Sequence, residues 1–250
     1  MKQDLRIALK SNNCSYFWLL IGTILLIFAN GRWIIPLATW LAPVFILRFV
    51  RTQKPARGLV ISLLALVMVY VIAWRGIIPL PGIFYYIVAG GIAFTFWLAF
   101  LADRLMTPRL QGFVGSLVFP LTWVLLEYVY TVISPFLSWG TLAYTQYGNH
   151  SLVQIVSVTG IWGVSFLITW FAAVINWAWE RDFTWQQIRL GVGLYTIVLA
   201  LVMLLGGLRL AVFPPQAGTV RIDSVVGTPE TEGLPNNDVT CPRLLYHFLS

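Results

Sequence analysis

Long apolar runs, separated by short stretches that carry the charges, are the dominant pattern along this chain. Residues 58–74, 76–102 and 128–179 contain no Asp, Glu, Lys or Arg. Crossing about 30 Å of hydrocarbon takes roughly 20 helical residues, and these runs supply them. Runs this long and this poor in charge do not fit the core of a soluble domain in a chain of 250 residues. The pattern therefore predicts an integral membrane protein.

Seven membrane-spanning helices are predicted, so the expected fold class is all-α, a polytopic helix bundle. Helices are expected because lipid offers no partner for backbone N–H and C=O groups. Pro36 and Pro43 in the second span predict a kink there, or a first part that lies in the interface. The expected spans are approximately 15–30, 33–50, 58–74, 83–101, 112–132, 151–179 and 188–210.

The basic residues predict the orientation of the chain. Most of the 16 Lys and Arg residues fall in alternate loops, beginning with the N-terminal segment. The positive-inside rule then places the N-terminus in the cytoplasm and, after seven spans, the C-terminus outside. Pro214 and Pro215 are expected to end the membrane part. The predicted domains are a transmembrane domain, 1–212, and an extracytoplasmic tail, 213–250.

Composition excludes several function classes. Hydrophobic residues make up 59% of the chain, charged residues 10%, and the mean hydropathy is +0.82. The net charge of +7 does not indicate nucleic acid, because the basic residues are distributed over short loops, so no nucleic-acid partner is expected. The Cys and His residues have no ligand spacing, and we expect neither a metal nor another cofactor. They are Cys14, Cys241, His150 and His247.

Glu127 is the carboxylate that falls inside a predicted span. An ionised side chain near the bilayer centre costs about 2.5–3.5 kcal/mol on insertion scales, so a residue there is expected to have a hydrogen-bond partner or a function. One interpretation is structural, with Glu127 hydrogen-bonded to Gln146, Tyr144 or Asn149. The other is a direct role in binding a lipid headgroup or moving a proton.

The connection that follows this span, residues 134–150, is uncharged, aromatic and rich in Gly, Ser and Thr. A loop exposed to water would ordinarily carry Lys, Glu or Asp, so this one predicts a re-entrant or interfacial platform. It either fixes the depth of the protein as an aromatic belt or contacts lipid. The candidate lipid- or substrate-facing residues are Glu127, Trp139, Tyr144, Gln146 and Asn149. For Gly160 and Gly163, one turn apart, close helix packing is the favoured interpretation.

An ordered set of polar, aromatic and glycine positions in this region resembles the membrane domain of bacterial apolipoprotein N-acyltransferases. These positions are Pro120, Trp123, Glu127, Ser138, Trp139, Gly140, Tyr144, Gln146, Gln154, Gly160, Gly163, Ser165, Phe166 and Asn176. Residues 219–226 resemble the first strand of the nitrilase-like domain that follows the spans in that family. Tyr130 departs from the pattern, since many relatives have Arg three residues after the Glu.

The resemblance implies a multi-pass protein of the bacterial inner membrane. It also implies acyl transfer from a membrane phospholipid, through a cysteine thioester, to the N-terminal amine of a lipoprotein. In the family a Glu, a Lys and a Cys of the nitrilase-like domain perform this chemistry. The three lysines here, Lys2, Lys10 and Lys54, all fall on the predicted cytoplasmic side, so we expect no catalytic residue in this chain.

Three functions follow as hypotheses. The first is the membrane-embedded part of an apolipoprotein N-acyltransferase-like protein. Its catalytic domain is expected to be missing and the tail truncated, and no acyl transfer is expected from the chain alone. Any contact with a lipoprotein would then come through that missing domain. The second is a small permease or channel with its path past Glu127. The third is a non-catalytic membrane scaffold that folds with a separate hydrolase-like subunit.

Overall fold

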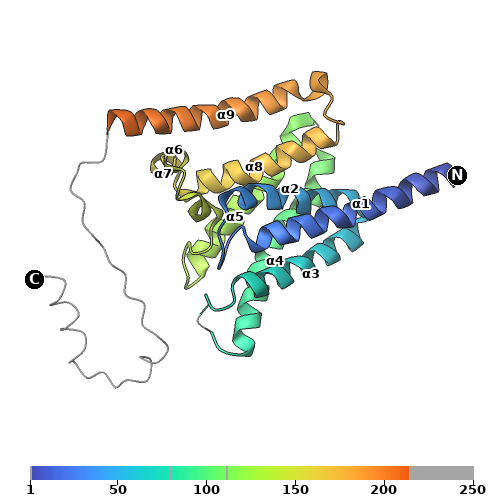
Figure 1. Cartoon of the computed structure of the whole chain (residues 1–250), viewed down its shortest axis with the longest axis horizontal. Coiled ribbons are helices and arrows are strands. Elements are labelled where there is room, and N and C mark those ends of the chain that lie inside the picture. The colour runs from blue at the N-terminus through green and yellow to red at the C-terminus, as the bar shows by residue number, and fades with distance from the viewer. Residues whose placement is uncertain (1, 79, 111, 214–250) are drawn as a thin grey trace, which may run out of the picture. The chain divides into compact units, whose positions relative to one another are not determined.

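Helices form almost all of the regular structure in the computed structural model (Figure 1). It describes residues 2–78, 80–110 and 112–213, with side chains from residue 15 onward, and no strand occurs within these ranges. The expected strand at 219–226 lies outside the described residues, as do Cys241 and His247. The long helices are α1 (Lys2–Ile27), α2 (Pro36–Thr52), α3 (Pro55–Ala73), α4 (Ile83–Met106), α5 (Val118–Ile133), α8 (Ile161–Trp179) and α9 (Trp185–Val212). The short helical pieces are η1 (Thr107–Arg109), η2 (Gly112–Leu117), η3 (Leu142–Gln146), α6 (His150–Val153) and α7 (Val156–Thr159).

The long helices run alternately between two ends of the described bundle. At one end Arg51 of α2 binds Asp103 of α4 and Glu180, which follows α8. At the other end the Asn30 side chain, after α1, donates to the carbonyl of Gly140. We call these the Arg51 end and the loop end.

The membrane character of the chain is supported, while the number of spans stays a prediction. Within the described residues, five helical segments are long and apolar enough to cross a membrane. They are Pro55–Ala73, Ile83–Arg109, Gly112–Ile133, Ile161–Trp179 and Trp185–Val212. The apolar part of α1, Ser15–Ile27, is shorter, and α2 has 17 residues with Pro36 as its first.

The prediction of one continuous span over 151–179 was wrong. The structure breaks this region into α6, α7 and α8. Gly160 ends α7 by donating its N–H to Val156 O, and its φ of +65° turns the chain before α8 begins. This left-handed conformation suits a glycine at a helix end, because it carries no Cβ. Within this region only α8 is long and apolar enough to cross a membrane, and α6 and α7 lie at the loop end.

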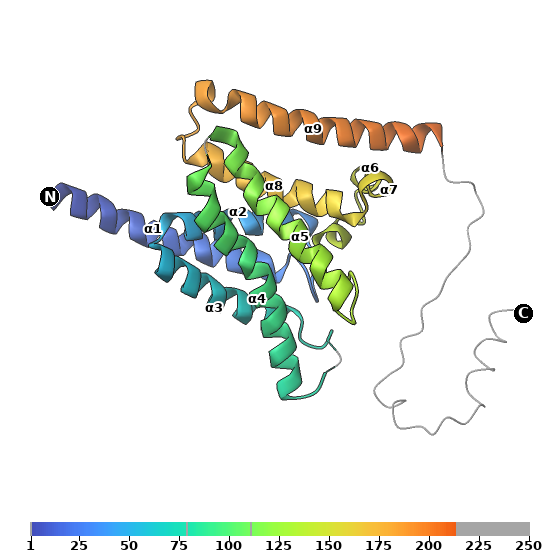
Figure 2. The same ribbon diagram turned by 180° about the vertical axis from the view of Figure 1, so that it is seen from behind.

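Of the five segments long enough to cross a membrane, helix α8 has the largest buried share, and it packs against α2, α5 and α9. Figure 2 shows α4 and α5 on one side of it and α9 on another. Small residues such as Ala172 and Ala173 are fully buried in α8, facing a core that includes Ala42 of α2. Small side chains let helices approach closely, which is how helices associate where lipid removes the hydrophobic driving force. Asn176 adds a polar link, because its amide donates to Val44 O at 2.9 Å.

An ion-pair network fastens the Arg51 end. The Arg51 guanidinium donates to both oxygens of the fully buried Asp103, at 2.8 and 2.7 Å, and to Glu180 at 3.1 Å. Arg104 donates to the backbone carbonyls of Arg51 and Gln53. The paired geometry matches the fork of a guanidinium to a carboxylate. Three helices that are distant in sequence, α2, α4 and α8, are thereby fixed to one another.

Changing Gly206 to alanine is expected to displace α9. A Cβ at this position would collide with the carbonyl oxygen of Ser151 in α6. We expect a loss of about 1–3 kcal/mol in the free energy of unfolding, the usual cost of overpacking. Gly207→Ala is the matched control, since its Cβ would lie 3.6 Å from the Ser151 hydroxyl, an ordinary contact. Thermal unfolding in detergent measures both, and equal effects would contradict the α6–α9 contact.

Candidate functional site

A buried carboxylate fixes the connection between α5 and α6. Glu127 lies in α5 with 0% of its surface exposed. Its Oε1 accepts two hydrogen bonds at 3.0 Å, from the indole N–H of Trp123 one turn earlier and from the backbone N–H of Leu142. Residues 134–149, which we call the connecting segment, are therefore tied to α5 by a side chain that a membrane interior would otherwise leave unpaired.

Glu127 was predicted to hydrogen-bond to Gln146, Tyr144 or Asn149, and this prediction of its partners was wrong. The carboxylate binds the backbone of the same segment at Leu142 instead, because the first residues of η3 lie over α5. The hydroxyl of Ser165 in α8 is also close to the carboxylate. Neither Glu127 Oε2 nor Ser165 Oγ has a direct hydrogen-bond partner among the described residues.

Gly140 brings the connecting segment against α3. Its φ is +88°, and a Cβ there would lie 2.5 Å from the ring of Trp74. The Trp139 ring packs edge-on against Trp74 with 5.5 Å between ring centroids, and 39% of Trp139 stays exposed. The Asn30 amide donates to Gly140 O from the end of α1. These contacts hold an aromatic surface at the loop end.

Gln146 links the connecting segment to α2. Its Oε1 accepts from the Trp40 indole at 3.1 Å, and its Nε2 donates to Pro36 O at 3.2 Å. Asn149 caps α6, with Oδ1 accepting from Leu152 N at 3.1 Å. These two candidate residues therefore bind backbone groups, Gln146 at the start of α2 and Asn149 in α6.

Tyr144 is the candidate that faces outward. It is 48% exposed, and its hydroxyl lies 2.7 Å from that of Ser138. The structure thus binds Glu127, Gln146 and Asn149 to backbone groups in or beside one segment and leaves Trp139 and Tyr144 partly exposed at its surface.

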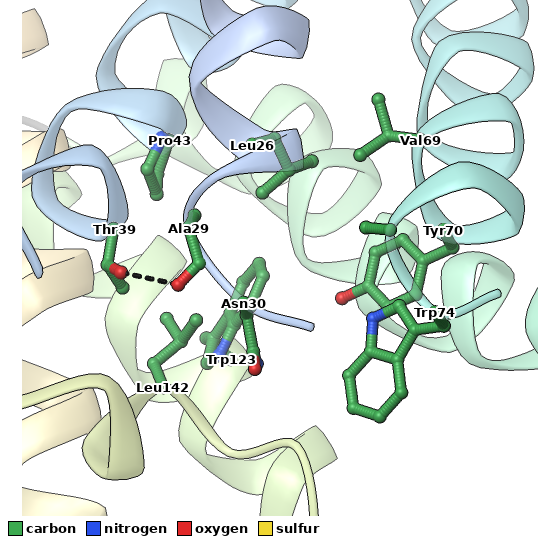
Figure 3. A pocket seen from close by; sticks show the side chains of 11 residues that line it. Leu26, Ala29, Asn30, Thr39, Pro43, Val69, Tyr70, Trp74, Trp123 and Leu142 are labelled. Carbon is green, nitrogen blue, oxygen red and sulfur yellow. Dashed lines mark hydrogen bonds between the residues drawn. The ribbon is translucent and has the colours of Figure 1, made fainter. Parts of the chain in front are cut away.

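A small, mainly apolar cavity of about 20 Å³ lies beneath this segment, and Figure 3 shows it from close by. Tyr70 of α3 and Trp74, just after α3, line it on one side, and Trp123 and Leu142 line it from the Glu127 site. Asn30 adds a polar group beside the Gly140 contact. The pocket places apolar space directly next to the buried carboxylate and its segment.

Several residues of this site were missed by sequence reasoning. Trp40 lies in α2, Trp74 follows α3 and Asn30 follows α1, so their participation depends on tertiary packing. Trp123 could have been assigned, because residues four apart lie on one face of a helix. No group of three or more His, Cys, Asp or Glu side chains that could hold a metal occurs in the described ranges.

Replacing Gly140 with alanine is expected to loosen the connecting segment. The added Cβ meets the Trp74 ring and also forces a positive φ on a residue with a side chain. We expect a cost of about 1–3 kcal/mol and faster cleavage of the segment by a protease. Gly148→Ala is the control, since nothing lies within 4 Å of its Cβ position. Unchanged proteolysis in Gly140→Ala would contradict the packing described here.

A known protein family matches the part of the chain that contains this site. The family described as the apolipoprotein N-acyltransferase N-terminal domain matches residues 21–174, more than half of the chain. The chain belongs to this family. The matched region runs from α1 into α8, so it contains Glu127 and the whole connecting segment.

Individual proteins similar to this chain are named apolipoprotein N-acyltransferases. The apolipoprotein N-acyltransferase of Rickettsia typhi is 27% identical over 107 residues, 43% of this chain and 21% of the relative. That of Geobacter metallireducens is 43% identical over 58 residues, 23% of this chain and 11% of the relative. Apolipoprotein N-acyltransferase 2 of Treponema pallidum is 34% identical over 87 residues, 35% of this chain and 14% of the relative. The chain thus matches less than a quarter of each relative's length. No solved structure is significantly similar to it.

Proposed function

We propose that this chain is the membrane-embedded part of an apolipoprotein N-acyltransferase-like protein in the bacterial inner membrane. In this proposal it crosses the membrane several times with its N-terminus in the cytoplasm. It supports acyl transfer from a phospholipid to the N-terminal amine of a lipoprotein. Family membership and the names of the relatives support the proposal.

One observation carries the proposal beyond the family match, namely the fixed connecting segment at the loop end. Its backbone is held by Glu127, Asn30 and the Gln146 contacts, while Trp139 and Tyr144 stay partly exposed. A rigid, uncharged aromatic surface suits the level of lipid headgroups, where one face is apolar and the other wet. We propose that Trp139 and Tyr144 contact the lipid substrates and that Glu127, Gln146 and Asn149 position the segment.

A chimera tests this function. Residues 15–213 would replace the matching membrane segment of the Geobacter metallireducens relative, in a strain whose own enzyme can be switched off. Mass spectrometry of lipoprotein N-termini should then detect the amide-linked acyl chain. A second chimera, with residues 134–141 replaced by a Gly/Ser linker of equal length, should lose it.

Two outcomes would contradict the proposal. One is a chimera that reaches wild-type levels in the membrane and yet leaves lipoproteins without the acyl group. The other is proton-driven solute uptake into vesicles that is abolished by Glu127→Gln, which would favour a permease instead.

A further inference from the structure

Two carboxyl groups are fully buried among the described residues, and they differ in what they bind. Asp103 pairs with the guanidinium of Arg51, which carries the opposite charge. Glu127 instead accepts two hydrogen bonds at Oε1 from uncharged donors, the Trp123 indole and the Leu142 backbone amide. The ion pairs found in the described ranges all include Arg51, and Glu127 takes part in none of them. Glu127 is therefore a buried carboxyl group that lacks a counter-ion within the described structure.

The described elements that pack against α5 supply no charge beside Glu127. Helix α8 and η2 contain no Asp, Glu, Lys, Arg or His. Helix α4 has Asp103 and Arg104, both at the Arg51 end, where Arg104 donates to backbone carbonyls. The phenol of Tyr70 in α3 is the titratable group that interacts with Glu127, and phenols are uncharged at neutral pH. The other titratable groups of α4, α5 and the connecting segment are also phenols, those of Tyr85, Tyr86, Tyr128, Tyr130, Tyr144 and Tyr147.

A second pair of buried polar atoms lies at the same place. Neither Glu127 Oε2 nor Ser165 Oγ has a direct hydrogen-bond partner among the described residues, although the two side chains are close. Both residues belong to segments long enough to cross a membrane, and Ser165 is fully buried. A charge buried without a counter-ion is very costly, and a carboxyl group avoids that cost by keeping its proton. The proton would also give Oε2 a hydrogen bond to donate.

We propose that Glu127 is a neutral carboxylic acid in the folded chain and that Oε2–H donates to Ser165 Oγ. The acid then accepts from Trp123 and Leu142 at one oxygen and donates to Ser165 from the other. It joins α5 to the connecting segment through Leu142 and to α8 through Ser165. Loss of the proton would leave a buried charge without a counter-ion and would remove the donor to α8. This inference does not depend on the proposed acyl transfer.

Infrared spectroscopy of the whole 250-residue chain, in a detergent without carbonyl groups, tests the protonation state. The C=O stretch of a neutral carboxylic acid absorbs above the amide I band, whereas an ionised carboxylate absorbs below it. At neutral pH, where exposed carboxyl groups are ionised, we expect an acid band. It should shift to lower wavenumber when the carboxyl carbon of glutamate is ¹³C, and it should disappear in Glu127→Gln. Glu180→Gln is the matched control and should leave the band unchanged, since Glu180 is partly exposed and pairs with Arg51. A wild-type spectrum without a glutamic acid band would overturn the proposal.

Three further variants test the hydrogen bond and the missing counter-ion. Ser165→Ala removes the acceptor of the acid proton, so the band should move to higher wavenumber. Tyr130→Arg places a guanidinium three residues after Glu127 on the same helix face, so the acid should ionise and the band should be lost. Tyr128→Arg is the control, because adjacent residues do not share a face and Tyr128 is 53% exposed. The spectra are compared for samples whose near-UV circular dichroism matches the wild type. A band that does not move in Ser165→Ala, or that persists in Tyr130→Arg, would contradict the proposal.

Discussion

Replacing Glu127 with alanine is expected to detach the connecting segment from α5. Two buried donors, Trp123 Nε1 and Leu142 N, would lose their acceptor at once. A buried donor left without a partner costs about 1–3 kcal/mol, so we expect a loss of about 2–5 kcal/mol in the free energy of unfolding. Thermal unfolding in detergent and proteolysis within residues 134–149 would report the change.

Glu127→Gln is the matched control for this experiment. Glutamine keeps an acceptor oxygen for both donors, and its NH₂ group can donate to Ser165 Oγ, which lacks a direct partner in the described structure. We therefore expect stability within about 1 kcal/mol of the wild type. If Glu127→Gln were as unstable as Glu127→Ala, the carboxylate would not act mainly as an acceptor. A stable Glu127→Gln chimera that failed to support acyl transfer would show that the carboxylate is needed for more than positioning.

Replacing Arg51 with methionine is expected to be more disruptive still. Asp103 is fully buried and pairs with the charge of Arg51, so the change leaves a carboxylate in the interior with only the hydrogen bond from the Thr107 hydroxyl. Breaking a buried ion pair from one side costs about 3–5 kcal/mol. Unfolding should be detected as a lower midpoint temperature of the change in tryptophan fluorescence.

Two further variants isolate the ion pair. Arg57→Ala is the control for loss of a basic residue, since Arg57 is exposed and lies over the Tyr16 ring, a contact worth about 0.5–1 kcal/mol. Asp103→Leu combined with Arg51→Met should recover part of the lost stability, because an apolar pair of similar volume can replace a buried ion pair. If Arg51→Met and Arg57→Ala lowered the free energy of unfolding equally, the Arg51–Asp103 pair would not be what holds α2 and α4 together.

The sequence predicted the helical class because charge-free runs and backbone hydrogen bonding leave few alternatives in lipid. It also singled out Glu127 and the segment after it, since a carboxylate in an apolar run and an uncharged aromatic connection are both visible locally. The break before α8 was missed, because Gly160 was interpreted as a helix-packing residue and not as a helix end. Its positive φ is a property of the folded backbone that composition does not reveal.

The partners of Glu127 could not be predicted from side chains alone. One is a backbone N–H, at Leu142, which has no signature in the residue type. The Arg51–Asp103 pair joins residues 52 positions apart and depends on how α2 and α4 pack.

The most direct test of the account is whether the loop end contacts the lipoprotein substrate. A photoreactive phenylalanine would be placed at Tyr144, which is 48% exposed, or at Leu105 near the Arg51 end, which is 49% exposed. Both variants would be made in the chimera and exposed to a biotinylated diacylated lipopeptide. Cross-linking is expected from position 144, and only background from position 105. Equal cross-linking from both positions, or cross-linking from position 105 alone, would contradict it.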